Sequence, residues 1–97
     1  MLENQKFRPI AVVGPLGEAI TLDTIPPADT TRWVARRKAE VVAAVNGGLL
    51  SVDEAMTRYG LSLEEFESWQ VTLRRVGMPG LRITHTQDYG HLRKRLG

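Results

Sequence analysis

A helix-start signal occurs twice in segment 50–77, LSVDEAMTRYGLSLEEFESWQVTLRRVG, and limits the possible folds more than any other feature. Ser51 is followed three residues later by Glu54, and Ser62 is followed by Glu65 at the same spacing. Each pair fits a capping box, in which the serine oxygen and the glutamate carboxylate accept the free N–H groups of a first helical turn. Gly60 lies between the two pairs and can adopt the positive φ that ends a helix. The segment therefore predicts two short helices joined by a tight turn.

The apolar residues of this segment favour a helix-turn-helix. We expect inward positions for Ala55, Leu61, Phe66 and Trp69, and a second helix over 63–76 that Gly77 ends. In DNA-binding proteins this motif places its second helix in the major groove.

The first part of the chain predicts a β-hairpin. A β-branched run over 10–13 and a second apolar run over 19–22 flank the turn sequence GPLG. Two strands are marginal alone, so the hairpin is expected to pack on the helices. Pro26-Pro27 then ends regular structure.

A further helix is predicted over 32–45. Residues 28–31 offer N-cap side chains, and Gly47 or Gly48 offers a left-handed cap. Lys38 is expected at the edge of the apolar stripe, with its stem buried and its ammonium group in water. Trp33 is expected in the first turn, packed against the hairpin. Beyond the second helix of the motif, which is predicted to end at residue 76, segment 81–84 is expected to be extended.

These predictions give one small domain with loose ends. Residues 1–9 are expected to be a flexible N-terminus, 10–84 the helix-turn-helix domain with its hairpin, and 85–97 a flexible basic tail. No apolar run is long enough to span a membrane, and the start MLENQKFRP lacks the apolar core of a signal peptide. The chain has no cysteine, which suits a cytoplasmic location.

Charge is unevenly distributed, although the net charge is only +2. Basic residues cluster before and after the helix-turn-helix, whereas acidic residues concentrate within it. The basic candidates are Arg32, Arg36, Arg37, Lys38, Arg74 and Arg75; the acidic ones are Glu64, Glu65 and Glu67. Basic patches favour polyanions such as nucleic acid, and a merely solvated face is the alternative.

Little in the chain indicates catalysis. His85 and His91 are its only histidines, so neither a zinc site nor any other metal site or cofactor is predicted. Segment 13–17 contains two glycines but lacks the spacing of a phosphate-binding loop. The serines and glutamates of the motif are expected to cap helices. We therefore expect a protein that is not an enzyme.

Several sequence blocks are distinctive: VVGP at 12–15, PPADT at 26–30, RWV at 32–34, RRKAEVVAAV at 36–45 and GGLLS at 47–51. They resemble the SciP family of small alphaproteobacterial proteins, also described as DUF1153. The resemblance implies a transcriptional regulator that inhibits the response regulator CtrA by direct contact and binds promoter DNA. The pattern from Glu54 to Trp69 is also similar to transposase and Trp-repressor-like helix-turn-helix domains. The resemblance thus implies a mainly α fold: a small three-helix, Trp-repressor-like domain with a short N-terminal β-hairpin.

Two modes of action follow. In the first, the protein binds double-stranded DNA in the nucleoid: Gln70 pairs with adenine, and Arg74 and Arg75 contact guanine or phosphate. The other four basic candidates contact phosphate. In the second, the protein is an adaptor or anti-activator whose three acidic candidates bind a basic response-regulator surface without DNA contact. The two modes are compatible, and a purely structural or oligomerisation module is the third alternative. The sequence leaves the oligomeric state open.

Overall fold

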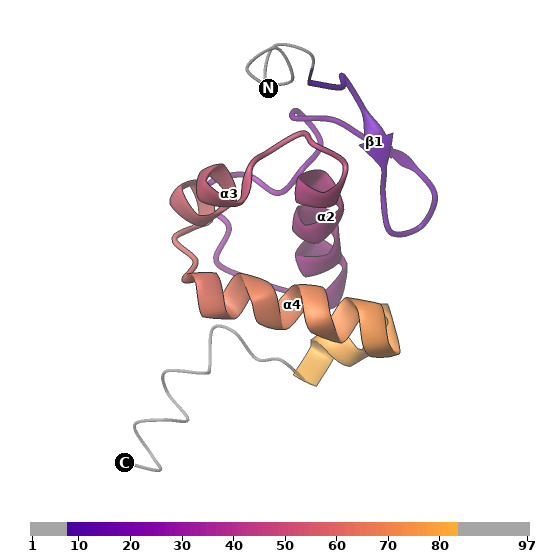
Figure 1. Ribbon diagram of the computed structural model, residues 1–97, viewed down its shortest axis with the longest axis vertical. Helices are drawn as coiled ribbons and strands as arrows, with labels where there is room; N and C mark the ends of the chain where they lie inside the picture. Colours follow the sequence, from indigo (N-terminus) through magenta and orange to yellow (C-terminus); the bar gives the residue numbers. More distant parts are fainter. Residues whose placement is uncertain (1–7, 84–97) are drawn as a thin grey trace.

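The computed structural model describes residues 8–83 (Figure 1). A two-stranded antiparallel sheet precedes three α-helices and a 3-10 helix, which confirms the predicted mainly α fold with an N-terminal hairpin. Most of the predicted flexible N-terminus and the predicted basic tail lie outside these residues. Within them, no helix is long and apolar enough to cross a membrane. The elements are β1 (Val12–Val13), β2 (Ala19–Ile20), α2 (Ala35–Asn46), α3 (Val52–Tyr59), α4 (Leu63–Val76) and the 3-10 helix η1 (Met78–Ile83).

Both predicted capping boxes are present. At the start of α3, the Glu54 N–H donates to the Ser51 hydroxyl at 3.1 Å and the Ser51 N–H donates to the Glu54 carboxylate at 2.9 Å. Ser62 and Glu65 repeat this exchange at the start of α4, with distances of 3.0 and 2.9 Å. Gly60 has a φ of 66° and ends α3 in the left-handed region. Local signals therefore determine both helix starts of the motif.

An aromatic cluster forms the centre of the core. Phe66 and Trp69 are fully buried on the inner face of α4. The Trp33 ring lies edge-on to Tyr59 and tilted against Trp69, with centroid separations of 5.1 Å in both cases. The Tyr59 hydroxyl donates to the Pro26 carbonyl at 2.6 Å. Trp33 thus links the segment before α2 to both helices of the motif. It precedes α2, so its predicted place in the first turn of that helix is wrong.

Helix α2 begins at Ala35, three residues later than predicted. The predicted cap at 28–31 does not form, because the Thr30 hydroxyl donates to the Pro27 carbonyl within a turn instead. Residues 31–34 then run without regular structure, which allows Trp33 to reach the aromatic cluster. The other end follows the prediction: Gly48 has a φ of 92°, and the Leu49 N–H donates to the Ala44 carbonyl at 2.8 Å. This is the Schellman arrangement of a helix end.

The hairpin lies against α2 near its C-terminal end (Figure 1). Val12 pairs with Ile20 and Val13 with Ala19, so the strands are shorter than the predicted runs. A Cβ atom at Gly47 would lie 2.5 Å from the Val12 Cγ1 atom, so glycine allows β1 to approach the helix end closely.

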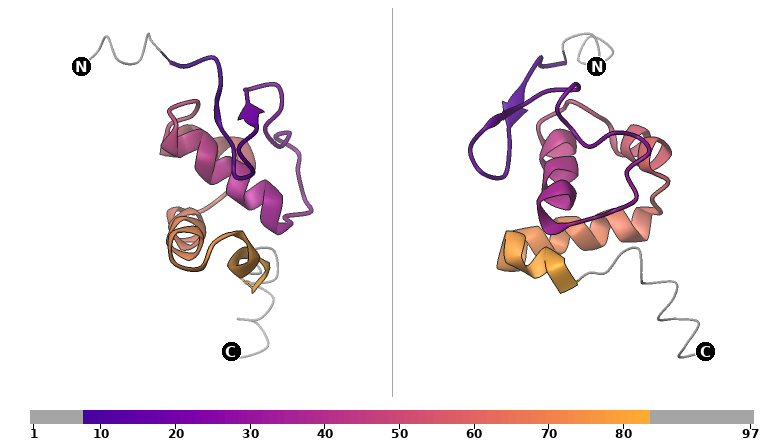
Figure 2. Two further views of the ribbon diagram at one scale, coloured as in Figure 1. Left: turned by 90° about the vertical axis from the view of Figure 1, so that its right-hand side faces the viewer. Right: turned by 180° about the vertical axis from the view of Figure 1, so that it is seen from behind.

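The 3-10 helix η1 contacts both α2 and α4 (Figure 2). The sequence predicts an extended segment at 81–84, whereas residues 78–83 form η1. Leu81 is fully buried, so burial of this one side chain between two helices accounts for the compact conformation. As a result, the start of α2 and the end of α4 lie beside the same element.

Candidate nucleic-acid and protein interface

The start of α2 is unusually basic. Its N-cap residue, Val34, makes no side-chain cap hydrogen bond, and its first turn contains no acidic residue. By contrast, α3 and α4 each have a capping box and two acidic residues in the first turn. Arg32, Arg36 and Arg37 lie at this start of α2 and are exposed. Because a helix N-terminus carries partial positive charge, these arginines add to a positive potential that a phosphate group would neutralise.

The three arginines differ in how much of their charge is already balanced. The Arg36 guanidinium forms ion pairs with Glu40 at 3.3 Å and with Glu18 of the hairpin at 3.7 Å. Arg37 instead donates to the Arg32 carbonyl at 3.2 Å. Within residues 8–83, neither Arg32 nor Arg37 forms an ion pair. Arg32 and Arg37 are therefore the stronger candidates for phosphate contacts.

Lys38 is not part of this surface. Its side chain is 2 % exposed, and its ammonium group donates to the Leu81 carbonyl at 3.0 Å. The same nitrogen lies 5.9 Å from the centroid of the Trp69 ring. The prediction that this ammonium group stays in water is wrong, because η1 folds over it. Lys38 connects α2 to η1 and is too buried to contact a phosphate. In the sequence, only the place of Lys38 on the apolar stripe of its helix indicates that its side chain is buried.

Helix α4 carries the other predicted contacts. Arg74 and Arg75 are exposed in its last turn. The Gln70 amide is half-buried and donates to the Asn46 side-chain oxygen at 3.4 Å, so one of its hydrogen bonds already links α4 to α2. The basic C-terminal end of α4 leads directly into η1, and η1 also lines a groove with residues at the basic start of α2, so both basic segments lie beside η1.

The three acidic candidates differ in how accessible their carboxylates are. Glu64 and Glu67 are exposed on α4. Glu65 is half-buried, and its carboxylate accepts the Ser62 N–H of the capping box. A partner protein can therefore reach Glu64 and Glu67, whereas the carboxylate of Glu65 is engaged in starting the helix.

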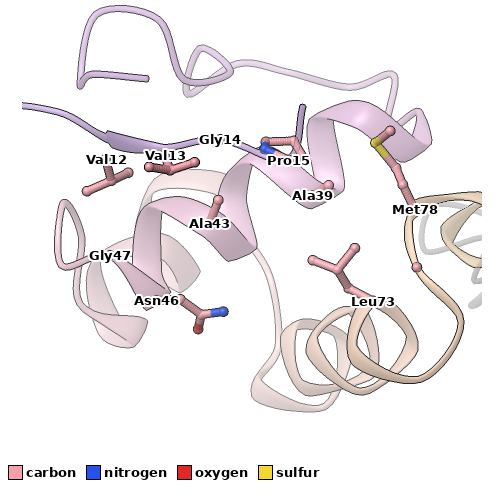
Figure 3. A pocket seen from close by; sticks show the side chains of 11 residues that line it. Val12, Val13, Gly14, Pro15, Ala39, Ala43, Asn46, Gly47, Leu73 and Met78 are labelled. Carbon is pink, nitrogen blue, oxygen red and sulfur yellow. The ribbon is translucent and has the colours of Figure 1, made fainter. Parts of the chain in front are cut away.

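Two shallow grooves border α2, one at its start and one along its middle and C-terminal end. One has a volume of 520 Å³ between α2 and η1 and includes the exposed Arg82, which lies beside the predicted surface but was not among the predicted contacts. The other has a volume of 680 Å³ between the hairpin, α2 and the end of α4 (Figure 3). It is lined by Val12, Val13, Gly14, Pro15, Ala39, Ala43, Asn46, Gly47, Leu73, Gly77 and Met78. None of these residues is charged, so this second groove has no cationic side chain that could pair with a phosphate.

Arg8 makes a contact that sequence reasoning missed. Its guanidinium forms two hydrogen bonds to the Glu54 carboxylate, at 2.7 and 3.1 Å, and one to the Leu49 carbonyl at 3.2 Å. The hydrogen bond from Arg8, followed by that from the Ser51 N–H, lowers the pKa of Glu54 below its ordinary value. This pair fastens the start of the described chain to α3. No local pattern could indicate this ion pair, because the two residues lie far apart in the sequence.

Residues 8–83 hold no group of three side chains suited to binding a metal.

A family model and two solved structures resemble this chain over most of its length. The model of a family described as "Protein of unknown function (DUF1153)" matches residues 4–90. The solution structure of the protein coded by gene RHOS4_12090 of Rhodobacter sphaeroides is 43 % identical, with a TM-score of 0.66, and the match covers 87 % of this chain and 88 % of that one. The solution structure of structural genomics target SiR5 is 42 % identical, with a TM-score of 0.56 and coverages of 92 % and 88 %. No curated protein matches the chain.

Proposed function

This chain belongs to the DUF1153 family of proteins of unknown function, and we propose that it is a helix-turn-helix transcriptional regulator that binds promoter DNA. We also propose that it inhibits a CtrA-like response regulator by direct contact, as the resemblance to SciP proteins implies. The observation that carries the DNA-binding proposal is the start of α2, where three exposed arginines lie at an N-terminus that has no side-chain cap hydrogen bond and no acidic residue in its first turn.

The geometry supports contact with the phosphate backbone more strongly than base readout. Backbone N–H groups at a helix start, together with nearby arginines, suit phosphate oxygens. The N-terminal half of α4, which would enter a major groove in a typical helix-turn-helix, instead carries Glu64 and Glu67. We infer that DNA lies against the start of α2 and the end of α4, with Arg32, Arg37, Arg74 and Arg75 as its main contacts.

Removing the two unbalanced arginines tests this assignment. In Arg32→Ala/Arg37→Ala, the slope of log affinity against log salt for a promoter duplex is expected to fall by about 1.8, because each lost phosphate contact removes about 0.9. Fluorescence anisotropy over a salt series measures the slope. Arg36→Ala is the matched control: because Glu18 and Glu40 already offset its charge, its effect is expected to be clearly smaller than that of either neighbour. An unchanged slope in the double variant would remove this surface from the DNA contact.

The second candidate function is an adaptor that binds a transcription factor without DNA. The exposed carboxylates of Glu64 and Glu67 favour it, since they would repel phosphates but suit a basic protein surface. In this case Glu64→Lys/Glu67→Lys abolishes binding to the DNA-binding domain of a response regulator, measured by calorimetry without DNA. Wild-type affinity in that variant would exclude these two residues from the interface.

A further inference from the structure

The outward face of α4 has an ordered charge pattern. Its residues recur at three- and four-residue spacing on the side opposite Phe66 and Trp69, and all of them are exposed, including Val71 at 37 %. From the start of the helix to its end, this outer α4 face consists of Glu64, Glu67, Ser68, Val71, Arg74 and Arg75.

The charges on the outer α4 face are separated along the helix. Both carboxylates lie in its first half, both guanidinium groups lie in its last turn, and a serine and a valine lie between them. Within residues 8–83, none of these four charged side chains forms an ion pair. Favourable charge at helix ends explains part of the pattern, because Glu64 lies in the first turn and the arginines lie in the last. It explains neither Glu67, which lies beyond the first turn, nor the exposed Val71.

We propose that the outer α4 face binds a second copy of this chain, with the two α4 helices antiparallel about a two-fold axis. An interface of this symmetry uses the same patch on both subunits, so the patch must be complementary to itself. Antiparallel alignment places Glu64 against Arg75 of the partner subunit, and Ser68 against Val71 of the partner subunit. It thus brings each acidic end to a basic end and covers both valines at the centre.

The length of α4 limits how tightly two copies of the chain are expected to bind. A helix of 14 residues is about 21 Å long, so a single helix pair buries less than the roughly 1,200 Å² of a stable interface. The dimer is therefore weak, exchanges quickly, and loses affinity as salt screens its exposed ion pairs. It also covers Arg74 and Arg75, so it competes with the DNA contact proposed above at the end of α4. Dimerisation itself does not depend on the proposed function.

A charge exchange tests the interface. Sedimentation equilibrium at low salt is measured on the full chain, on Glu64→Arg/Glu67→Arg, on Arg74→Glu/Arg75→Glu, and on an equimolar mixture of the two variants. The wild-type chain is expected to self-associate, and each variant alone is expected to remain monomeric because its outer α4 face carries only one sign of charge. The mixture is expected to dimerise at least as tightly as the wild type. That recovery also shows that both variants are folded.

Orientation is tested separately. The chain contains no cysteine, so Leu63→Cys allows a spin label to be placed at one site at the start of α4. Mixed with unlabelled ¹⁵N protein, it is expected to broaden amide signals near residue 76 of the other copy, and not those near 63. A wild-type chain that stays monomeric at millimolar concentration, a mixture that stays monomeric, or broadening near 63 alone would overturn the proposal. Because no DNA is present, none of these outcomes bears on DNA binding.

Discussion

Replacing Trp69 with alanine is expected to destabilise the domain by about 4 kcal/mol, within the usual range for a buried tryptophan. Trp69 is fully buried and contacts Trp33 from the segment before α2. The truncation therefore leaves a cavity where α4 meets that segment, and loosens both. Since small domains have about 5–15 kcal/mol of total stability, this change removes a large part of the stability of the domain.

Urea denaturation followed by circular dichroism measures this change. Ser68→Ala is the matched control, because Ser68 precedes Trp69 on α4 but is exposed, and its effect is expected to stay within about 0.5 kcal/mol. A loss below about 1.5 kcal/mol in Trp69→Ala would show that the aromatic cluster is not the centre of the core.

The second large effect is expected at Lys38, where alanine should destabilise the domain by about 3 kcal/mol. The substitution removes a donor from the Leu81 carbonyl and leaves a gap where the buried stem was. Loss of the donor also weakens the connection between α2 and η1. The melting temperature and the urea midpoint both measure the change.

Two further variants show how much of the lost stability comes from the buried stem and how much from the hydrogen bond and the charge. Lys38→Met keeps a stem of similar length and removes only the hydrogen bond and the charge, so it is expected to cost less than alanine. Arg37→Ala changes an exposed neighbour on the same helix and is expected to stay within about 0.5 kcal/mol. Equal effects of Lys38→Ala and Arg37→Ala would restore the expectation that the ammonium group of Lys38 lies in water.

The parts of the fold that the sequence predicts well are those determined by near neighbours. Ser51 and Ser62 start helices because their partners lie only three residues away, and Gly60 ends one because it tolerates a positive φ. Helix α4 consequently has the predicted bounds. The start of α2 is different: residues 28–31 provide good caps, but packing of the half-buried Trp33 against Tyr59 and Trp69 outweighs that local preference.

The same difference between local signals and long-range contacts applies to the candidate site. Arg37, Arg74 and Arg75 are exposed as helical periodicity predicts, because they lie away from the apolar stripes of their helices. Arg32 is also exposed, but it precedes α2. Long-range contacts could not be predicted. The pairing of Arg36 with Glu18 depends on where the hairpin lies, and the burial of Lys38 depends on η1 folding back over α2. Of the family resemblance drawn from the sequence, the match over residues 4–90 confirms the DUF1153 membership.

The central proposal is that this protein contacts DNA through the start of α2 and the end of α4. An amide NMR titration of the ¹⁵N-labelled chain with a promoter duplex, at two salt concentrations, tests it most directly. The account predicts shifts concentrated at residues 32–37 and 70–75 that shrink as salt rises, because phosphate contacts release counterions. A flat titration at low salt would contradict it, and would make the protein-binding adaptor the primary account.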